Sequence, residues 1–393
     1  MSGAPHVAQV GFYTDPARRR PGELLDAWPT LLDVAQAAQE GGARVSLIQT
    51  SSYTERLTRN GVGCYFLPYG EGSSGSGYAA LGELLAELSP DLIHVHGLGF
   101  ARDVEALAAR EPDVPIVLQD HASGLPPFWR RVAWRRGLSH AAGLAFCAAA
   151  QARPFASAGL IHPHTRVYEI PESTSRFTPG DRAGARASTG VRGDPALLWV
   201  GHLNANKDPL TVLEGVSAAT DLLPNLRLYC CFGVAPLLRA VEERIAGDRR
   251  LRERVELLGH VPHERIETLM RAADLFVLGS HKEGSGYSLI EALACGLMPV
   301  VTDIPSFRAL TGAGTVGALW PCGDSRAFSN SLQAAWGRAD AKMRGAVRTH
   351  FDRELSFAAL GRKLVAMYRD VIERRGVSAP MLPPTEPRAL GSS

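Results

Sequence analysis

Glu283 and Glu291 are the most informative pair of residues in the sequence, because seven residues with a Gly-Ser-Gly turn separate them. A carboxylate accepts hydrogen bonds from hydroxyl groups, so this pair could bind the diol of a ribose and the hydroxyls of a sugar. Gly284 and Gly286 lack a Cβ, and the backbone around them can therefore turn sharply and approach a ligand. The spacing predicts a loop that binds a phosphorylated sugar.

The sequence around this loop predicts a strand before it and a helix after it. The apolar run 274–279 is typical of a buried strand, and 289–294 is rich in residues that favour helices. If the helix begins near Tyr287, its free N–H groups and the positive end of its dipole point into the loop and favour an anion there. Similar loops occur in α/β domains without any ligand. Neighbouring motifs therefore have to show whether this loop binds a ligand or only connects a strand to a helix.

A longer pattern continues through this segment and reads Glu283-Gly284-x-Gly286-x4-Glu291-Ala292-x2-Cys295-Gly296-x2-Pro299-Val300-Val301. It resembles the donor-site signature of glycosyltransferase family 4, whose members are retaining enzymes with the GT-B fold. The resemblance covers nearly the whole chain and is strongest over 197–302. It implies that Glu291 binds the ribose and that Glu283 binds the donor sugar. It also implies donor contacts from the loop and the helix start, namely Gly284, Ser285, Gly286, Tyr287 and Ser288.

A second candidate loop follows the apolar run 197–200 and contains His202, Asn206 and Lys207. Ligands of parallel sheets bind beyond the carboxyl ends of the strands, so a cation here would meet a diphosphate held by the first loop. The segment resembles the second phosphate element of the family, which usually has Gly-Arg followed by Lys. Lys207 fits that element, whereas His202 stands at the arginine position, and an imidazole is only partly charged near pH 7.

Three further sites carry over from the family by resemblance. Gly259 and Val261 belong to a loop that would face the nucleotide base, mainly through its backbone. His121 ends an apolar run of the first half, where the family has a histidine near the reacting centre. Gly22 stands where the family has a Gly-rich loop close to the donor phosphate and the acceptor, although this chain has one glycine there.

Apolar runs typical of strands alternate with helical patterns, which predicts parallel sheets covered by helices. Strands are expected at 6–13, 44–50, 65–68, 91–96, 114–119 and 143–148 in the first half, and at 197–200, 227–232, 255–258, 275–278, 298–302 and 317–320 in the second. The fold class is therefore α/β. With the resemblance it becomes a GT-B fold, in which two doubly wound, Rossmann-like domains face each other across a cleft.

The boundaries of these domains follow from changes in composition. We expect an N-terminal acceptor-binding domain at 1–172, an interdomain linker at 173–194, a C-terminal donor-binding domain at 195–356, a helix at 357–376 that returns to the first domain, and a disordered tail at 377–393. The Gly/Ser-rich segment 70–77 lacks the Gly-Lys-Ser/Thr of a P-loop and is expected to be a mobile loop beside the acceptor site.

Composition limits the classes of function. The chain has 393 residues, of which 45% are hydrophobic and 21% charged, as in ordinary globular proteins of two or three domains. A net charge of +2 argues against a general role in binding nucleic acid. Six cysteines lack C-x-x-C spacing, and neither a signal peptide nor an apolar run of about 18 residues is visible. We therefore expect a cytoplasmic protein with reduced thiols and at most peripheral membrane contact.

Two other groups of residues suggest different chemistry. His94 and His96 fall on one face of a strand and, with His121, could imitate a three-histidine metal site. The resembled family has Asp-x-x-His-x-His-Gly at this strand end without a metal, so no metal is expected. The segment 128–136 mixes aromatic residues with arginines. As a helix it would either lie on an anionic membrane or pack on its own domain with an exposed basic edge.

The residues and the resemblance together predict a glycosyltransferase that moves a sugar from a UDP-, GDP- or ADP-sugar to an unidentified acceptor, without a cofactor or a metal. The catalytic residues are expected to be His121, Glu283 and Lys207. Lys207, His202 and the amides near Gly286 would stabilise the charge of the departing diphosphate. By resemblance, the reaction retains the anomeric configuration through a front-face mechanism, and no carboxylate of the first domain stands out as a nucleophile.

Three alternatives stay open at this point. The first is another nucleotide-sugar enzyme on the same fold, such as an epimerase or a phosphorylase. The second is a metal-dependent hydrolase that uses the three histidines. The third is a catalytically silent nucleotide-sugar-binding protein, which the histidine at position 202 makes plausible.

Overall fold

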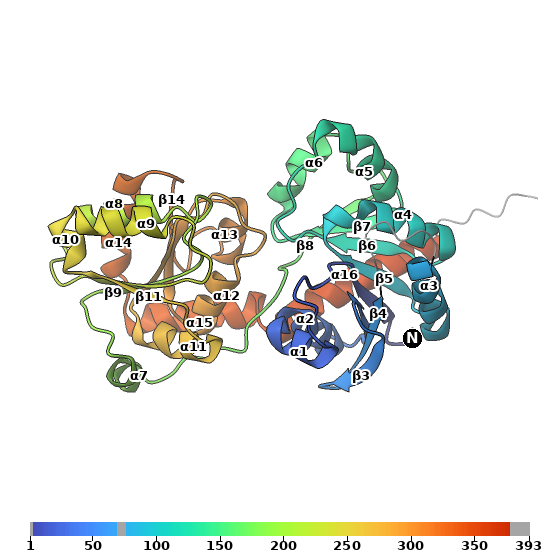
Figure 1. Ribbon diagram of the computed structural model, residues 1–393, viewed down its shortest axis with the longest axis horizontal. Coiled ribbons are helices and arrows are strands. Elements are labelled where there is room, and N and C mark those ends of the chain that lie inside the picture. Colours follow the sequence, from blue (N-terminus) through green and yellow to red (C-terminus); the bar gives the residue numbers. More distant parts are fainter. Residues whose placement is uncertain (1–2, 69–75, 378–393) are drawn as a thin grey trace, which may run out of the picture.

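Two sheets, each covered by helices, organise the chain into two lobes (Figure 1). The structure is a computed structural model and describes residues 3–68 and 76–377. Most of the expected mobile loop (70–75) and nearly all of the expected tail (378–393) lie outside the described residues. Within the described ranges, no helix combines the length and the apolar character needed to cross a membrane.

The first lobe contains an eight-stranded sheet in the order β3-β4-β2-β1-β5-β6-β7-β8, in which only β3 and β4 pair antiparallel. Its strands are β1 (His6–Gly11), β2 (Arg44–Ser51), β3 (Glu55–Arg59), β4 (Val62–Pro68), β5 (Leu92–His96), β6 (Ile116–Gln119), β7 (Ala141–Phe146) and β8 (Arg166–Glu169). Its helices are α1 (Pro21–Ala27), α2 (Pro29–Glu40), α3 (Ser76–Leu88), η1 (Leu98–Phe100), α4 (Ala101–Arg110), η2 (Phe128–Arg130), α5 (Arg131–Leu138), η3 (Ala149–Ala152) and α6 (Arg153–Ser157). The central strands are apolar because helices bury both of their faces.

The second lobe contains a six-stranded parallel sheet in the order β11-β10-β9-β12-β13-β14. Its strands are β9 (Ala196–Val200), β10 (Arg227–Cys231), β11 (Val255–Gly259), β12 (Leu275–Leu278), β13 (Met298–Thr302) and β14 (Ala318–Trp320). Its helices are α7 (Arg182–Thr189), α8 (Pro209–Ala219), α9 (Leu238–Ala246), α10 (Arg249–Arg252), α11 (His263–Ala272), α12 (Tyr287–Ala294), α13 (Pro305–Leu310), α14 (Ser325–Trp336) and α15 (Ala341–Glu354). The predicted α/β class with two doubly wound, Rossmann-like domains is confirmed.

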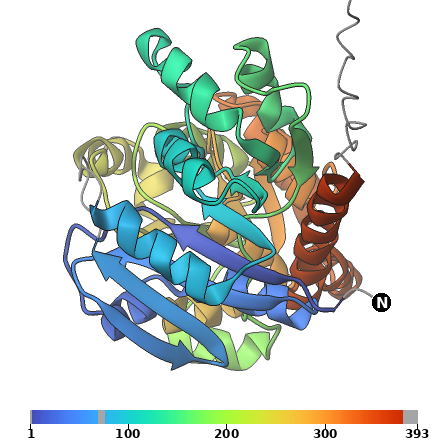
Figure 2. The same cartoon turned by 90° about the vertical axis from the view of Figure 1, so that its right-hand side faces the viewer.

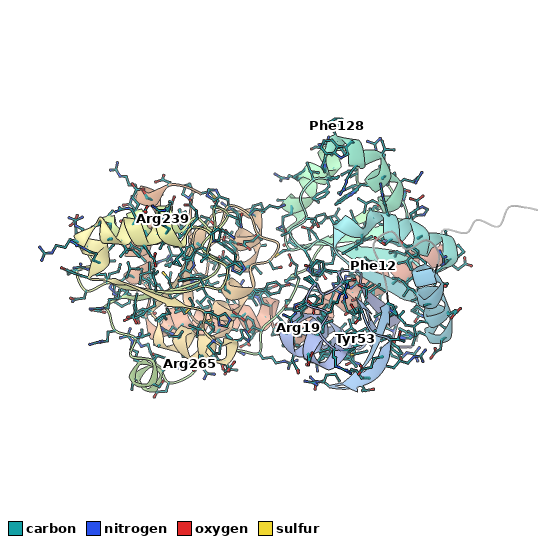
Figure 3. The ribbon with its side chains drawn as sticks, viewed as in Figure 1. Phe12, Arg19, Tyr53, Phe128, Arg239 and Arg265 are labelled. Atoms are coloured by element: carbon teal, nitrogen blue, oxygen red, sulfur yellow. The ribbon has the colours of Figure 1, made fainter. Side chains whose placement is uncertain are left out.

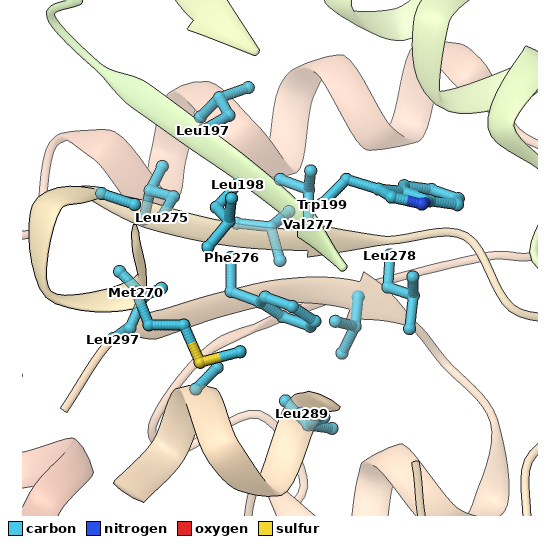
Figure 4. Packing of buried hydrophobic residues seen from close by; sticks show 14 of the residues in the cluster. Leu197, Leu198, Trp199, Met270, Leu275, Phe276, Val277, Leu278, Leu289 and Leu297 are labelled. Atoms are coloured by element: carbon cyan, nitrogen blue, oxygen red, sulfur yellow. The ribbon is translucent and has the colours of Figure 1, made fainter. Parts of the chain in front are cut away.

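The core of the second lobe fixes the two strands from which the candidate donor loops leave. Leu198 on β9 and Phe276 on β12 are neighbours in the sheet and are both fully buried. Figure 4 shows this packing, with Leu289 of α12 and Met270 of α11 on the same side of Phe276. Burial of such side chains contributes about 1.5 to 3 kcal/mol each. Strands β9 and β12 therefore form a rigid base for the loops at their carboxyl ends.

The last helix, α16 (Phe357–Val377), packs on the first lobe. It crosses α2 at Gly41 and Gly361, where a Cβ on Gly361 would lie 2.1 Å from the Ala37 carbonyl oxygen. Only glycine permits backbones to approach this closely. Tyr368 of α16 is fully buried and joins the core of the first lobe. Figure 2 shows α16, in dark red, running alongside the sheet of that lobe.

Two edge strands of the first lobe were missed by the sequence analysis, because neither has an apolar pattern. Strand β3 (Glu55–Arg59) is polar and mostly exposed, and among the described residues it pairs only with β4. The Asn60-Gly61 turn between them has positive φ angles of 51° and 78°. Asn-Gly is the strongest short-range signal for a hairpin, so this strand was readable in the sequence. Strand β8 is another short polar edge strand and carries no comparable signal.

Two expected connecting segments contain helices. The second half of the expected linker forms α7, which Arg182 and Arg186 attach to the buried Asp274 through ion pairs of 2.6 Å each. This half of the linker therefore belongs structurally to the second lobe. The segment around Gly22 begins α1 rather than forming a loop. Pro21 occupies the first helical position, where its missing N–H costs nothing.

Candidate active site

The topology of both sheets determines where the candidate loops meet. In the second sheet, strand order reverses between β9 and β12, and in the first sheet it reverses between β1 and β5. Open α/β sheets bind ligands beyond the carboxyl ends of their strands at such reversal points. The Lys207 loop follows β9 and the Glu283 loop follows β12, so the second sheet places both loops at its switch point.

Gly286 shapes the turn between the Glu283 loop and α12. Its φ of 86° lies in the left-handed region that favours glycine, and a Cβ here would lie 2.7 Å from the Phe307 ring. The carbonyl oxygen of Gly286 accepts the backbone N–H groups of Leu289 and Ile290, which starts α12 at Tyr287. The helix thus begins where the sequence predicted, with the positive end of its dipole at this loop.

Asn206 joins the two loops of the second lobe side by side. Its Nδ2 donates to the Lys282 carbonyl oxygen at 2.9 Å, and its Oδ1 accepts the Lys282 N–H at 3.1 Å. The backbone oxygen of Asn206 also accepts the N–H of His281 at 2.8 Å. The side chain of Asn206 therefore positions the loop, which is a different task from the donor contact expected for it.

Lys207 and Glu283 form an ion pair between the two loops of the second lobe, with 2.5 Å between Nζ and Oε1. Both side chains are largely covered, at 15% and 12% exposure. The Asn204 side chain accepts the backbone N–H of Lys207 at 2.9 Å and fixes the turn that delivers the lysine. The structure thus brings together a cation suited to a diphosphate and a carboxylate suited to sugar hydroxyls.

Glu291 lies one turn inside α12 and pairs with His263, the first residue of α11. The distance from Nε2 to Oε1 is 2.5 Å, and this contact raises the pKa of His263 above its ordinary value. Gly259 ends β11 with a φ of 67°, and Val261 is partly buried against the core of the lobe. The loop with Gly259 and Val261, which is expected to face the base, is therefore followed directly by His263, the partner of Glu291.

His121 follows the end of β6 and lies between His96 and Glu172. Its Nε2 lies 3.2 Å from Nδ1 of His96, and its Nδ1 lies 3.3 Å from Oε2 of Glu172. His94 lies behind them, fully buried and hydrogen-bonded to the Tyr368 hydroxyl at 2.9 Å. Burial lowers the pKa of His94 to about 3 and that of His96 well below 6.5. His94 and His96 are therefore neutral at pH 7.

The three histidines do not form a metal centre in this structure. Across residues 3–68 and 76–377, no group of three or more His, Cys, Asp or Glu side chains is arranged to hold a metal ion. His94 uses its Nδ1 for Tyr368, and His121 turns its Nδ1 to Glu172. These ring nitrogens therefore have partners within the protein.

Glu172 is a buried carboxylate of the first lobe for which the sequence predicts no role. Its side chain is 5% exposed, and burial raises its pKa despite the opposing effect of His121. Oε1 makes no hydrogen bond within the described part of the chain. That oxygen lies 1.6 Å from the position a Cβ on Gly284 would occupy. The backbone of the donor loop therefore covers one oxygen of Glu172, and His121 occupies the other.

Five hydrogen bonds attach the donor loop to the first lobe. Gln151 Nε2 donates to the Glu283 and Gly284 carbonyl oxygens at 2.8 and 3.1 Å, and Ser285 Oγ accepts the backbone N–H of Glu172 at 2.8 Å. Lys282 Nζ donates to the Ala122 carbonyl oxygen at 3.2 Å and to that of Ser123 at 2.8 Å. Gly284 and Ser285 are thus at the interface between the lobes, and their contacts bring the loop next to the His121 segment.

Ala122, directly after His121, has a φ of 59° although it is not glycine. Such a conformation costs about 1 kcal/mol or more and is commonly found at functional sites. The contact with Lys282 and the close approach of Gly284 to the Ala122 nitrogen hold this strained residue in place. Contacts with the second lobe therefore hold the backbone next to His121 in this conformation.

The remaining expected site residues are His202, Gly22, Tyr287 and Ser288. His202 is exposed, and its Nδ1 accepts the Val234 N–H at 3.2 Å, which directs it to the β10 loop. Gly22 lies in the first turn of α1 with open space around its Cβ position. Tyr287 and Ser288 occupy the first turn of α12, and the pKa of Tyr287 is raised by burial and by Glu172.

Sequence reasoning missed Glu172, Gln151, Lys282 and His263. Lys282 directly precedes Glu283 and His263 follows the expected base loop, so their positions were signals that went unused. Glu172 and Gln151 carry no motif. Their roles come from the way the first lobe packs against the donor loop.

Comparisons with known proteins are consistent with this geometry. Residues 181–339 match the family described as "Glycosyl transferases group 1", and residues 27–171 match the "Glycosyl transferase 4-like domain". The GDP-mannose:cellobiosyl-diphosphopolyprenol alpha-mannosyltransferase of Xanthomonas oryzae is 26% identical over 259 residues. That match covers 64% of this chain and 66% of the relative, slightly under two thirds of its length. The D-inositol 3-phosphate glycosyltransferase of Mycolicibacterium gilvum is 32% identical over 162 residues, which cover 40% of this chain and 35% of the relative.

Solved structures show the same fold over almost the entire chain. Sucrose-phosphate synthase from Thermosynechococcus elongatus superimposes with a TM-score of 0.69 at 19% identity, covering 94% of this chain and 100% of that one. Anabaena Alr3699/HepE in complex with UDP and glucose gives a TM-score of 0.66 at 17% identity and covers 92% of this chain and 99% of that one. At these identities the likeness establishes the fold, and it confirms the predicted GT-B architecture.

Proposed function

We propose, because the chain belongs to glycosyltransferase family 4, that it is an enzyme that transfers a sugar from a nucleotide diphosphate sugar to an acceptor. The observation that carries the proposal is the meeting of the Lys207–Glu283 pair with the His121 segment at the boundary between the lobes. One side supplies charges suited to a nucleotide sugar, and the other supplies a histidine at the face where an acceptor would arrive. Relatives named for a GDP-mannose donor and structures that contain UDP support the same donor class.

The donor would bind along α12 and the loop before it. Glu291 would accept hydrogen bonds from the ribose hydroxyls, with His263 as its present partner. The N-terminus of α12 and Lys207 would hold the diphosphate, and Glu283 would bind the sugar. The proposal covers UDP-, GDP- and ADP-sugars, because Gly259 and Val261 would present mainly backbone to the base.

Departure of the nucleoside diphosphate would be the difficult step, since negative charge grows on the leaving oxygen while the sugar becomes cationic. Lys207 would stabilise that charge, and the amides at the start of α12 would assist it. Two such sources of positive potential allow the leaving group to depart without a metal ion. We therefore include metal independence in the proposal.

A front-face reaction is the mechanism that the first lobe supports best. A double displacement needs an enzyme carboxylate that can attack the anomeric carbon. Glu172 is a buried carboxylate beside His121, but His121 and the backbone at Gly284 cover its two oxygens. Glu172 would therefore position His121, and the acceptor would attack from the side that the leaving group vacates. The configuration of the anomeric carbon would be retained.

Binding and stereochemistry test the proposal separately. UDP, GDP and ADP are added singly in a thermal-shift experiment, and one of them should raise Tm because it binds only the folded protein. The matching sugar donor is then supplied with candidate acceptors, and NMR should show the α- or β-configuration of the donor preserved in the product. Activity should persist in the presence of a chelator.

Each failure has a distinct meaning. Absence of a Tm shift with all three nucleotides would refute the donor site. Inversion of configuration would refute the front-face mechanism while leaving the donor site intact. Donor turnover without an acceptor would instead indicate an epimerase, and turnover that requires phosphate would indicate a phosphorylase. Binding of a nucleotide without turnover of any donor would indicate a silent binding protein.

A further inference from the structure

The outer end of the first lobe carries a surface of large apolar side chains. Leu125, Phe128, Trp129 and Val132 are 40%, 74%, 69% and 78% exposed, and we call this surface the aromatic face. They are four of the nine exposed large hydrophobic residues in the described part of the chain. Figure 3 shows Phe128 at the outer edge of the lobe, away from the rest of the molecule. Contiguous exposed apolar side chains usually mark a surface that binds something.

The helix behind the aromatic face is firmly attached to the lobe. In α5, a Cβ on Gly137 would lie 1.9 Å from the Ala101 carbonyl oxygen, so α5 and α4 cross at backbone contact. Leu138 is fully buried, and Arg136 forms an ion pair with Glu105 at 2.8 Å. The inner side of the segment is therefore packed on its own domain, as one of the two interpretations of the sequence expected. The outer side of the segment, which includes Phe128, is exposed to solvent, and the packed inner side holds it in place.

The charged side chains of the segment that carries the aromatic face have one sign, and one of them, Arg136, is paired with Glu105 of α4. The sequence from 121 to 164 contains no aspartate or glutamate, and its arginines are Arg130, Arg131, Arg135, Arg136 and Arg153. Arg130 is exposed beside Phe128 and Trp129. A protein interface usually combines both charges around an apolar centre, whereas a segment with arginines alone is complementary to a broad anionic surface.

We infer that the aromatic face binds the surface of an anionic lipid bilayer. Phe128, Trp129 and Val132 would enter the interfacial region, where aromatic rings are favoured, and Arg130 would contact lipid phosphates. Phe128 follows His121 by seven residues, so the chain cannot separate the two by more than about 25 Å. Attachment at this face would hold the candidate active site near the bilayer. This inference goes beyond the proposed transferase activity and does not depend on it.

Co-sedimentation with vesicles tests the inference on the full chain. Wild-type protein should pellet with vesicles that contain phosphatidylglycerol and remain in solution with vesicles of phosphatidylcholine alone. The double variant Phe128→Ser/Trp129→Ser should bind at least about tenfold more weakly, because two large side chains no longer leave water. The matched control, Leu222→Ser/Val234→Ser, removes exposed apolar side chains of the second lobe (68% and 62% exposed) and should bind like the wild type.

Charge is tested with a second matched pair. Arg130→Gln should weaken binding about fivefold, and higher salt should weaken the binding of the wild type. Arg265→Gln, an exposed arginine of α11, should have no effect. Unchanged Tm values would show that the variants fold.

Three results would overturn the inference. The first is equal binding of the wild type and the Phe128→Ser/Trp129→Ser variant to anionic vesicles. The second is equal binding of the wild type to both vesicle types. The third is self-association in analytical ultracentrifugation that the double variant abolishes while no form of the protein binds vesicles, since the aromatic face would then contact a second copy of the chain.

Discussion

Two contacts between an acidic and a basic side chain at the boundary between the lobes differ in their surroundings. Lys207 and Glu283 lie on adjoining loops of the second lobe with 15% and 12% of their side chains exposed, and both keep an opposite charge as partner. Glu172 of the first lobe is 5% exposed, and its partner His121 does not prevent burial from raising its pKa. The Lys207–Glu283 pair therefore has charges that a ligand can share. In the His121–Glu172 pair, ionisation of the buried Glu172 carboxylate destabilises the fold.

This difference assigns different tasks to the two sides. A lysine paired at a loop can turn to a diphosphate at little cost, because one anion replaces another. A buried carboxylate with an unsatisfied oxygen persists where function needs it, since most proteins avoid such groups. We expect changes on the donor side to reduce turnover strongly without affecting folding, and changes at Glu172 to affect activity and stability in opposite directions.

The largest effect is expected for Lys207→Ala. Loss of one positive charge at the developing diphosphate should lower kcat/KM about 100- to 1000-fold, a typical cost for removing one such group. Initial rates with the donor identified by thermal shift would measure it. Lys342→Ala, which removes an exposed lysine of α15, is the control and should behave as the wild type. Full activity of Lys207→Ala would show that Lys207 does not stabilise the departing diphosphate.

Gly284→Ala should disturb the boundary itself. The new methyl group would overlap Oε1 of Glu172 and approach the Ala122 nitrogen to 2.9 Å, so the donor loop must move away from the first lobe. Overpacking of this kind costs about 1 to 3 kcal/mol, and we expect a lower Tm and activity reduced about tenfold or more. Gly345→Ala places a methyl group in open space on α15, so it should leave the rate unchanged and should not lower Tm, because alanine favours a helix over glycine. If Gly284→Ala retains wild-type Tm and rate, the close contact between the lobes is unimportant.

Glu172→Gln separates the two sides most clearly. The pKa of Glu172 is raised above 4.5, so its favourable contribution to stability is present below pH 4.5 and is lost as pH rises through the folded pKa. Above that range the ionised carboxylate destabilises the fold, and glutamine removes the charge. The Tm of the variant relative to wild type should therefore rise as pH increases above 4.5. Its kcat should fall about tenfold, because His121 loses its charged partner.

Calorimetry across pH, together with kinetics at pH 8, would measure the response of Glu172→Gln. Glu169→Gln, an exposed carboxylate on β8 of the same lobe, is the control. A Glu172→Gln variant that is both less stable at pH 8 and fully active would show that Glu172 is an ordinary structural residue.

The smallest effect is expected for His263→Ala, which tests the donor side as a source of stability. Glu291 raises the pKa of His263, so the pair stabilises the fold fully below pH 6.5 and loses this contribution as pH rises through the folded pKa. His263 is 63% exposed, and the Tm difference from wild type should be about 1 to 2 °C at pH 6 and vanish by pH 9. His140→Ala, at another exposed histidine, should show no such trend. A difference that grows toward pH 9 would contradict the assigned pairing.

Much of the fold was predictable because buried parallel strands leave long apolar runs in the sequence. The strands β9, β12 and β13 appeared at their observed positions within a residue or two. Polar edge strands such as β3 and β8 lack that pattern, since they pack on one side at most. Helix α7 was assigned to the linker because its arginines and alanines give a weak signal, while its attachment to Asp274 depends on tertiary contact.

The sequence by itself determined the donor half of the candidate site. The glycines, Glu283 and Glu291 lie within one strand-loop-helix unit, and Lys207 lies in the loop after the neighbouring strand β9, so local geometry alone places them. Only the tertiary structure decided what surrounds His121. Glu172 and Gln151 reach the donor loop from positions more than 100 residues away in the chain, and their importance comes from burial and from contact between the lobes. Burial and long-range contact are properties of the packed chain, and no local pattern of residues encodes them.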